Sequence, residues 1–337
     1  MRYHTLGPTG VLVSELCLGT MTFGESWGLG GIDVNAATAL VTRALDAGIN
    51  FVDTADVYSE GRSEEILGQA LRGRRDRVVL ATKAFGRMGK GANDSGLSRY
   101  HLVRACEASL RRLGTDRIDL DQVHGFDALT PIEETLRALD QLVASGKVVS
   151  VGFCNLAAWQ AAKALGISGS NGLAKFVSAQ MYYSLVGRDV EHEVVPFCLS
   201  EGLALLPWSP LAGGFLTGKY RRDQAGHPEG SRFATSKFGE FPPVDKAKGF
   251  DVVDRLLELA VAHDTTPTTI ALKWLLSRAV VTSVIIGVRH LEQLDANLAA
   301  TSVEVTQEAL DGLTEMTEPP TLYPNWMIQR QAVNRVI

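Results

Sequence analysis

Four residues in the first half of the chain could transfer a proton together: Asp53, Tyr58, Lys83 and His124. Asp53, Lys83 and His124 each close one of three successive apolar segments, and Tyr58 follows shortly after Asp53. A phenol has a pKa of about 10 and is a weak acid at neutral pH, but a neighbouring cation lowers that pKa. Lys83 could supply the charge while Asp53 keeps the lysine protonated. We therefore expect Tyr58 to be a general acid, with a neutral His124 orienting the oxygen that receives the proton.

A proton donor of this kind needs a partner that delivers two electrons. No protein side chain does so, and a hydride cofactor is therefore implied. Lys83 could instead form a Schiff base with a carbonyl substrate, and that alternative stays open. A metal-dependent hydrolase is disfavoured because the sequence has no HxH or HExxH, so no metal site is expected. A Rossmann dinucleotide site is disfavoured because the glycine-rich patch at 28–31 has Asp33 where GxGxxG requires glycine.

The elements that must position these residues alternate along the chain. The expected strands are 16–19, 50–53, 78–83, 118–124, 148–152, 176–180, 203–208 and 283–287. The expected helices include 33–47, 98–113, one opened by a capping box at 130–133, 157–165, 190–201, 267–277 and 290–299. Unbroken strand–helix alternation implies a parallel sheet, and eight units close into a (β/α)8 TIM barrel. Because adjacent strands lie about 4.8 Å apart, the ends of three neighbouring strands bring their side chains within reach of one another.

Two segments stand outside this alternation. Residues 1–14 are typical of a β-hairpin around Gly7-Pro8-Thr9-Gly10, which would plug the bottom of the barrel. Residues 212–246 form a long polar connection after the seventh strand, and connections of this length are usually functional lids or disordered. No linker composition divides the chain, so residues 1–337 are expected to form a single domain.

Composition excludes several other classes of protein. The chain has 337 residues, of which 45% are hydrophobic and 21% charged, as in ordinary globular proteins. With 33 basic against 38 acidic residues, nucleic acid and acidic membranes are not expected as partners. Four widely spaced cysteines without CxxC favour reduced thiols, and no leader or long apolar run is found. The expected location is cytoplasmic, with a small-molecule partner and the oligomeric state left open.

Ordered motifs surround the four residues. They are Leu18-Gly19-Thr20-Met21-Thr22-Phe23-Gly24, Phe51-Val52-Asp53-Thr54-Ala55-Asp56-Val57-Tyr58, Ser63-Glu64-Glu65-Ile66-Leu67-Gly68, Ala81-Thr82-Lys83, Asp119-Leu120-Asp121-Gln122-Val123-His124, Val151-Gly152-Phe153-Cys154-Asn155, Gln180 with Tyr183-Ser184-Leu185, Trp208-Ser209-Pro210-Leu211 and Leu216-Thr217-Gly218-Lys219-Tyr220. Over essentially the whole chain this series resembles the aldo-keto reductase superfamily, and within it the bacterial aryl-alcohol-dehydrogenase-like branch.

The resemblance implies an enzyme that reduces an aldehyde or ketone with NADPH. It implies that Tyr58 donates the proton, that Lys83 and Asp53 tune it, and that His124 aligns the carbonyl. It also implies a nicotinamide site in which Asn155 and Gln180 hold the carboxamide and Tyr183 stacks on the ring. The other cofactor contacts that it implies are Gly19, Thr20, Met21, Trp208, Ser209, Pro210, Leu211, Gly213, Lys219, Gly287, Arg289, Gln293 and Asn297.

Three positions depart from the family pattern and bear on specificity. Cys154 replaces a serine, and a thiol is a weaker hydrogen-bond partner. Gly125-Phe126 replaces Trp-Pro in a wall of the substrate pocket, whose other expected members are Phe23, Trp27 and Trp326. Gly287 stands where animal reductases carry a lysine, so the preference for NADPH rests on Arg289, whose planar fork suits a 2′-phosphate.

A second function class fits the same fold. Cofactor-binding regulatory subunits, like those attached to potassium channels, share this barrel and act on a protein partner. The complete set of Tyr58 and Lys83 favours the enzyme.

Overall fold

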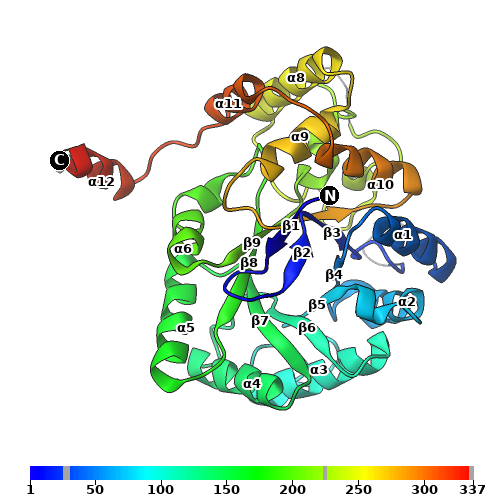
Figure 1. Ribbon diagram of the computed structural model, residues 1–337, viewed down its shortest axis with the longest axis vertical. Coiled ribbons are helices and arrows are strands. Elements are labelled where there is room, and N and C mark those ends of the chain that lie inside the picture. The colour runs from blue at the N-terminus through cyan, green and yellow to red at the C-terminus, as the bar shows by residue number, and fades with distance from the viewer. Residues whose placement is uncertain (26–30, 223–225, 334–337) are drawn as a thin grey trace.

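The computed structural model describes residues 1–25, 31–222 and 226–333. Its centre is one sheet of eight parallel strands in the order β10-β3-β4-β5-β6-β7-β8-β9 (Figure 1). The strands are β3 (Leu16–Gly19), β4 (Phe51–Asp53), β5 (Val79–Ala84), β6 (Ile118–Val123), β7 (Val148–Cys154), β8 (Phe176–Tyr182), β9 (Ala204–Trp208) and β10 (Val284–Gly287). Between β9 and the approach to β10, the N–H of Thr282 donates to the carbonyl oxygen of Leu205 at 2.9 Å. The sheet is therefore a nearly closed barrel.

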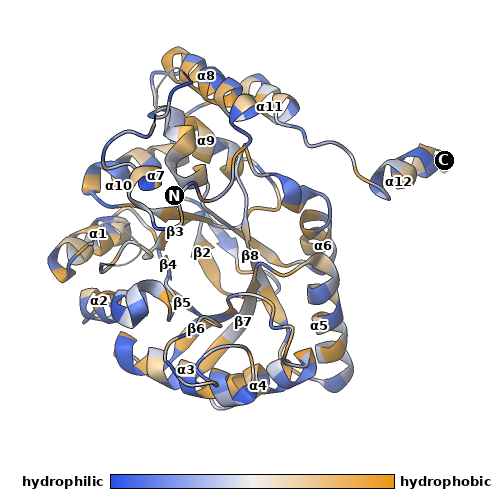
Figure 2. Cartoon of the chain, turned by 180° about the vertical axis from the view of Figure 1, so that it is seen from behind, coloured by the Kyte–Doolittle hydropathy of each residue, from blue (hydrophilic) through white to orange (hydrophobic). Residues whose placement is uncertain are grey.

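Helices surround the strands and complete the (β/α)8 arrangement, which confirms the predicted fold class. They are α1 (Val34–Asp46), α2 (Arg62–Ala70), α3 (Arg99–Leu113), α4 (Ile132–Ala144), α5 (Ala158–Asn171), α6 (Val194–Glu201), α7 (Arg232–Thr235), α8 (Lys246–Ala262), α9 (Pro267–Leu276), α10 (Leu291–Leu298), α11 (Gln307–Met316) and α12 (Asn325–Ala332). Figure 2 shows both hydrophilic and hydrophobic residues on these helices, as expected when one face of each helix packs on the sheet.

Local sequence signals explain where several helices begin and end. Asp33 and Ser98 cap α1 and α3 by accepting hydrogen bonds from backbone N–H groups of the first turn. Gly114 ends α3 in the left-handed conformation, at φ 63°. The capping box predicted at 130–133 is wrong. The hydroxyl of Thr130 donates to Asp127 Oδ2 at 2.7 Å, and α4 begins after Pro131 without a side-chain cap.

The predicted N-terminal hairpin is present. Strands β1 (Tyr3–Thr5) and β2 (Leu12–Ser14) pair antiparallel, and they lie across one end of the barrel in Figure 1. Leu6 and Val13 from this hairpin are buried inside the barrel. They pack there in one cluster with Cys17, Phe51, Ala81, Leu120, Val177, Ala204, Leu206 and Ile285. The hairpin therefore fills the bottom of the barrel with apolar side chains.

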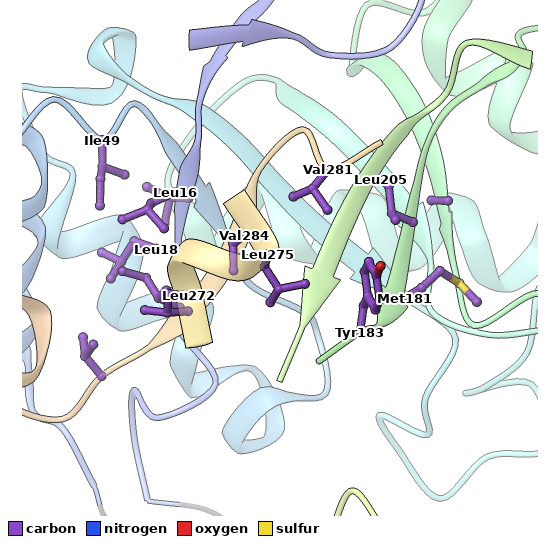
Figure 3. Close-up of a cluster of buried hydrophobic side chains, with 14 of the residues drawn as sticks. Leu16, Leu18, Ile49, Met181, Tyr183, Leu205, Leu272, Leu275, Val281 and Val284 are labelled. Carbon is purple, nitrogen blue, oxygen red and sulfur yellow. The ribbon is translucent and has the colours of Figure 1, made fainter. Parts of the chain in front are cut away.

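A larger core lies between the strands and the helices. Leu16 and Leu18 on β3 belong to it, whereas Cys17 between them points into the barrel. Figure 3 shows Leu16 and Leu18 together with Leu272 and Leu275 of α9. Both faces of β3 are thus buried, which explains why its sequence is a continuous apolar segment.

The described residues of the connection 212–246 carry little regular structure. A 3-10 helix covers Ala212–Thr217, and α7 is a single turn before α8 begins at Lys246. Phe233 in α7 is buried and stacks on Tyr220, with ring centroids 4.9 Å apart. The described part of this connection is therefore packed against itself by aromatic side chains.

Candidate active site

The ends of β4, β5 and β6 bring Asp53, Lys83 and His124 to the same end of the barrel. Asp53 pairs in register with Ala81, and Lys83 pairs with Gln122. The fully buried Lys83 donates from Nζ to Asp53 Oδ1 at 2.5 Å, to the carbonyl oxygen of Thr54 at 2.7 Å and to Tyr58 Oη at 3.2 Å. The three protons of the ammonium group each have an acceptor.

The charge state of Lys83 follows from these contacts. Burial alone would lower the pKa of Lys83, but the negative charge of Asp53 and its hydrogen bond raise that pKa on balance. A Schiff-base nucleophile needs a neutral amine. A lysine held as ammonium by three acceptors does not favour the Schiff-base alternative.

Tyr58 lies on a tight loop that directs its hydroxyl to Lys83. Ser59, Glu60 and Gly61 follow it with φ of 49°, 55° and 92°, a left-handed run that reverses the chain. The Ser59 hydroxyl donates to the carbonyl oxygen of Phe23 at 2.9 Å and so ties this loop to the end of β3. The reversal places Tyr58 where its hydroxyl accepts the hydrogen bond from Lys83 Nζ.

The pKa of Tyr58 differs from the sequence-based expectation. Burial raises it, and although Lys83 lowers it as expected, the net shift is upward. The expected net lowering of this pKa is therefore wrong. Taking a phenolate out of water is unfavourable by more than the attraction of the Lys83 ammonium group is favourable. Tyr58 consequently keeps its proton throughout the neutral range.

His124 stands edge-on to Tyr58, with ring centroids 5.8 Å apart and planes at 75°. Burial and the charge of Lys83 lower the pKa of His124 to about 3. The imidazole is therefore neutral at every pH near physiological, with one N–H to donate.

Two amide side chains predicted at the nicotinamide site lie next to this group. Gln180 is buried, and its Nε2 donates to Asp53 Oδ2 at 2.9 Å. Asn155 has a positive φ of 56°, and its Oδ1 accepts from Trp208 Nε1 at 3.1 Å. The first contact connects β8 to the ion pair of Asp53 and Lys83, and the second connects the ends of β7 and β9 to each other.

The structure does not bring Tyr183 to this site. Its ring is 1% exposed, packs edge-on against Trp274 at 5.6 Å, and lies in the core between strands and helices (Figure 3). Its hydroxyl donates to Glu191 Oε1 at 2.6 Å. The half-exposed Trp208 at the end of β9, bonded to Asn155, is the aromatic ring at the mouth. Sequence could not separate the two because each lies at or just past the end of a barrel strand.

A cluster of positive charge lies near the phenol. Burial and then the charge of Arg289 lower the pKa of both Lys219 and Arg232, and Arg232 is also close enough to interact with Tyr58. Neither these two nor Arg289 forms an ion pair with a carboxylate in the described ranges. Arg232, on α7, was missed because a single arginine in a long polar connection carries no periodic or motif signal.

The turn after β9 is built from residues with positive φ. Ser209, Ala212, Gly213 and Gly214 have φ of 50°, 48°, 67° and 91°, and the N–H groups of Ala212 and Gly214 donate within the turn, to the carbonyl oxygens of Ser209 and Leu211 at 2.9 Å. Pro210 and Leu211 lie within this turn. A Cβ on Gly213 would lie 2.6 Å from the Phe233 ring and 2.8 Å from the carbonyl oxygen of Phe241, so glycine is required there. Lys219 Nζ lies beside Gly214, and its charge together with that of the nearby Arg232 suits a diphosphate group.

The loop after β10 carries the remaining predicted contacts. The exposed Gly287 ends β10, and the backbone N–H of Arg289 donates to Gln293 Oε1 at 2.8 Å. Gln293 and the buried Asn297 are four residues apart on α10 and share one face. Arg289 Nη1 reaches the carbonyl oxygen of Gly230 at 3.3 Å, so this loop meets the connection 212–246.

The three cofactor contacts predicted at the end of β3 and just after it lie in different environments. Thr20 is fully buried, and its hydroxyl bonds Ser63 and the carbonyl oxygen of Asp53. It supports the strand end rather than facing a cofactor, so the predicted contact is not supported. Gly19 packs against β10, since a Cβ there would lie 2.8 Å from Ile285 Cγ2, and Met21 is half-buried.

The predicted substrate walls are only partly assembled. Phe126 is exposed and packs edge-on with Trp159 at 6.2 Å. Phe23 is fully buried in the outer core, so it lines no open pocket, and Trp27 lies outside the described residues. Trp326 is on α12, which stands away from the barrel in Figure 1. It does not reach the site, because an extended segment carries α12 outward.

No group of three or more His, Cys, Asp or Glu among the described residues has the arrangement of a metal site. No helix within the described ranges has the length and apolarity to cross a bilayer.

Comparisons with known proteins agree with the barrel fold. A sequence model of the aldo/keto reductase family matches residues 15–318. The chain is 35% identical to the versiconal hemiacetal acetate reductase of Aspergillus parasiticus, over 96% of this chain and 99% of that protein. It is 37% identical to the uncharacterized oxidoreductase YrpG of Bacillus subtilis (strain 168), over 95% and 97%. It is also 36% identical to a probable voltage-gated potassium channel subunit beta of Oryza sativa subsp. japonica, over 94% and 97%.

Proposed function

The chain belongs to the aldo/keto reductase family, and we propose that it reversibly reduces an aldehyde or ketone to the alcohol with NADPH. Members of this family use nicotinamide cofactors and act on small molecules. The observation that carries the proposal is the buried Lys83 ammonium, 3.2 Å from Tyr58 Oη and paired with Asp53. A phenol and an ammonium group held in contact at a barrel mouth serve proton transfer to a substrate oxygen.

Tyr58 is the proton donor in this proposal. NADPH, when bound, supplies the hydride for the carbonyl carbon. The hydroxyl of Tyr58 gives its proton to the oxygen, and the phenolate that remains accepts a hydrogen bond from Lys83 Nζ. His124, neutral because its pKa is about 3, donates one N–H to the same oxygen and orients it. Asp53 holds Lys83 in place.

We propose that residues around the mouth hold the cofactor along its length. We assign Asn155 and Gln180 to the carboxamide and the ring face of Trp208 to the nicotinamide, in place of Tyr183. The rest of the cofactor is assigned to the turn after β9 with Lys219 and Arg232 for the diphosphate, to Arg289 for the 2′-phosphate, and to Gln293 and Asn297 for the adenine, with Gly19, Met21 and Gly287 alongside.

The connection 212–246 is proposed to act as a lid over the cofactor. It carries Arg232 and Phe241, and the Phe241 ring stacks on Trp208 at 5.8 Å with planes 17° apart. Arg289 also contacts it at Gly230. A cofactor beneath these contacts would be held from both sides, which favours slow release.

The regulatory alternative has one observation in its favour. A relative of 36% identity is named as a probable potassium channel subunit beta. The proton-donor group favours the enzyme, because a regulatory subunit needs no phenol in contact with a buried ammonium. All four cysteines are buried and unpaired, as expected of the reducing cytoplasm that we propose as its location.

The proposal is tested by mixing the protein with a panel of aldehydes and ketones and following the consumption of NADPH. Wild type should turn over at least one carbonyl. Tyr58→Phe should lose at least about a hundredfold in turnover, the lower range for general acid catalysis, yet still bind NADPH, measured as quenching of tryptophan fluorescence. If Tyr58→Phe turns over like wild type, the assignment of the proton donor is refuted. Binding without turnover of any carbonyl by wild type would support the regulatory alternative.

A further inference from the structure

Gln122 has no role in the mechanism above, yet it lies at the centre of the site. It is on β6 two residues before His124, and its side chain points into the barrel with 1% of the residue exposed. Its Nε2 donates to Asp53 Oδ2 at 3.1 Å, and its Oε1 accepts from Gln180 Nε2 at 3.3 Å. The thiol of Cys154 also approaches Oε1, at 3.9 Å. One amide therefore contacts three residues of the site.

The two carboxylate oxygens of Asp53 have different partners, one on the side of Lys83 and the other on the side of the two glutamines. Oδ1 accepts from Lys83, and Oδ2 accepts from Gln122 and from Gln180 at 2.9 Å. Because a carboxylate only accepts hydrogen bonds, both glutamines must turn their NH2 groups towards it. Gln122 Oε1 then faces Gln180 Nε2, and the orientation of each amide is determined by the other.

The barrel provides space for this amide. Gly152 on β7 pairs in register with Gln122. A Cβ on Gly152 would lie 3.2 Å from Gln122 Cγ and would collide with Ser178 Oγ. A glycine at the neighbouring strand position is thus what allows a glutamine to fill the barrel here.

We propose that Gln122 is a positioning residue that joins the proton donor to the nicotinamide end of the site. It acts through Asp53, which holds Lys83 against Tyr58, and through Gln180. The inference rests on the proposed function, since Gln180 is assigned there to the carboxamide. It also explains why a cysteine is tolerated at 154: the direct amide contact between Gln122 and Gln180 supplies orientation that a weak thiol cannot.

Gln122→Met keeps the shape of the side chain and removes both hydrogen bonds. Bonds to charged groups are worth about 1.5–3 kcal/mol, so turnover should fall by roughly tenfold or more. Release of Gln180 should weaken NADPH binding by a smaller factor, measured by tryptophan fluorescence. The surface variant Gln141→Met, which removes only an acceptor for Arg99, should change neither quantity.

Gln122→Glu separates positioning from packing. A protonated carboxyl group donates one hydrogen bond and accepts another, as the amide does, whereas an ionised one repels Asp53. The turnover of Gln122→Glu should therefore approach wild type at acid pH and fall to the level of Gln122→Met as pH rises. NADPH binding should follow the same dependence. If Gln122 served only in packing, the turnover of each variant relative to wild type would be the same at all pH values.

Two results would overturn the inference. One is a Gln122→Met enzyme with wild-type turnover and NADPH affinity, and the other is parallel pH profiles for the Met and Glu variants. Thermal midpoints of all variants identify any loss of fold. Failure of the proposed function is distinct, since wild type itself would then reduce no carbonyl with NADPH, and the inference about Gln122 would fall with it.

Discussion

Asp56 is a buried acid, and replacing its carboxyl group by an amide should stabilise the protein. The gain in unfolding free energy should increase with pH. Asp56 lies two residues before Tyr58, is fully buried, and neither carboxylate oxygen makes a hydrogen bond of good geometry with a described residue. Glu64 and Asp121 are buried beside it, and Arg112 pairs with Glu64 at 2.6 Å. One guanidinium group thus faces three carboxyl groups.

The magnitude follows from the pKa of Asp56. Burial, and then the charge of Glu64, raise that pKa to about 8, while the backbone of Val57 and the charge of Arg112 lower it by less. An unfolded aspartate has a pKa of about 3.9. The native state therefore holds the proton more tightly, and stability is lost as pH rises from about 4 to about 8, by at most about 1.4 kcal/mol per pH unit. Asp121, with a pKa of about 7, titrates in the same window.

The assay compares Asp56→Asn with wild type by urea unfolding at several pH values. The variant should match wild type near pH 4, apart from a constant offset for the buried amide. It should become more stable by several kcal/mol, roughly 3 to 5, by about pH 8 and then level off. The exposed carboxyl of Asp46 at the end of α1 provides a control, since Asp46→Asn should show no such slope. A stability difference for Asp56→Asn that is flat with pH would refute the reasoning.

Two further predictions concern the ion pair and the cofactor. Lys83→Met should cost about 3–5 kcal/mol in thermal unfolding because it leaves Asp53 buried and unpaired, and adding Asp53→Asn should recover stability but not turnover. Recovery of turnover as well would argue against the role of Lys83. Arg289→Ala should weaken NADPH roughly tenfold to a hundredfold and leave NADH unchanged. Arg232→Ala should weaken both cofactors alike, because the diphosphate is common to them, and fluorescence titration with each cofactor distinguishes the two outcomes.

The sequence predicted the barrel and its proton-donor group because both depend on local patterns. Strand ends were readable from apolar segments that stop at a polar residue, as at Asp53 and His124. In a closed barrel consecutive strands are neighbours, so residues adjacent along this series were expected to be adjacent in space. The contact of Lys83 with Asp53 follows from that topology.

Contacts made across the barrel or by irregular segments could not be predicted in this way. Gln122 and Gln180 are hydrogen-bonded to each other, and both donate to Asp53, although β6 and β8 are not adjacent in the sheet. Arg232 reaches the mouth only because Phe233 and Tyr220 pack the connection that carries it. Tyr183 was misplaced because one residue past the strand end reverses the direction of a side chain. Each case depends on packing at a distance in sequence.

The raised pKa of Tyr58 changes what Lys83 is expected to do. In the resting protein burial outweighs the ammonium group, so Lys83 does not make the phenol a strong acid. Its charge matters once the proton leaves, because the phenolate then forms 3.2 Å from a fixed cation that already has its hydrogen bonds in place. An alkoxide is far more basic than a phenolate, so a donor that stays protonated until the alkoxide develops loses no driving force. Burial thus keeps Tyr58 protonated until transfer, and the preorganised Lys83 and Asp53 stabilise the negative charge that appears on it.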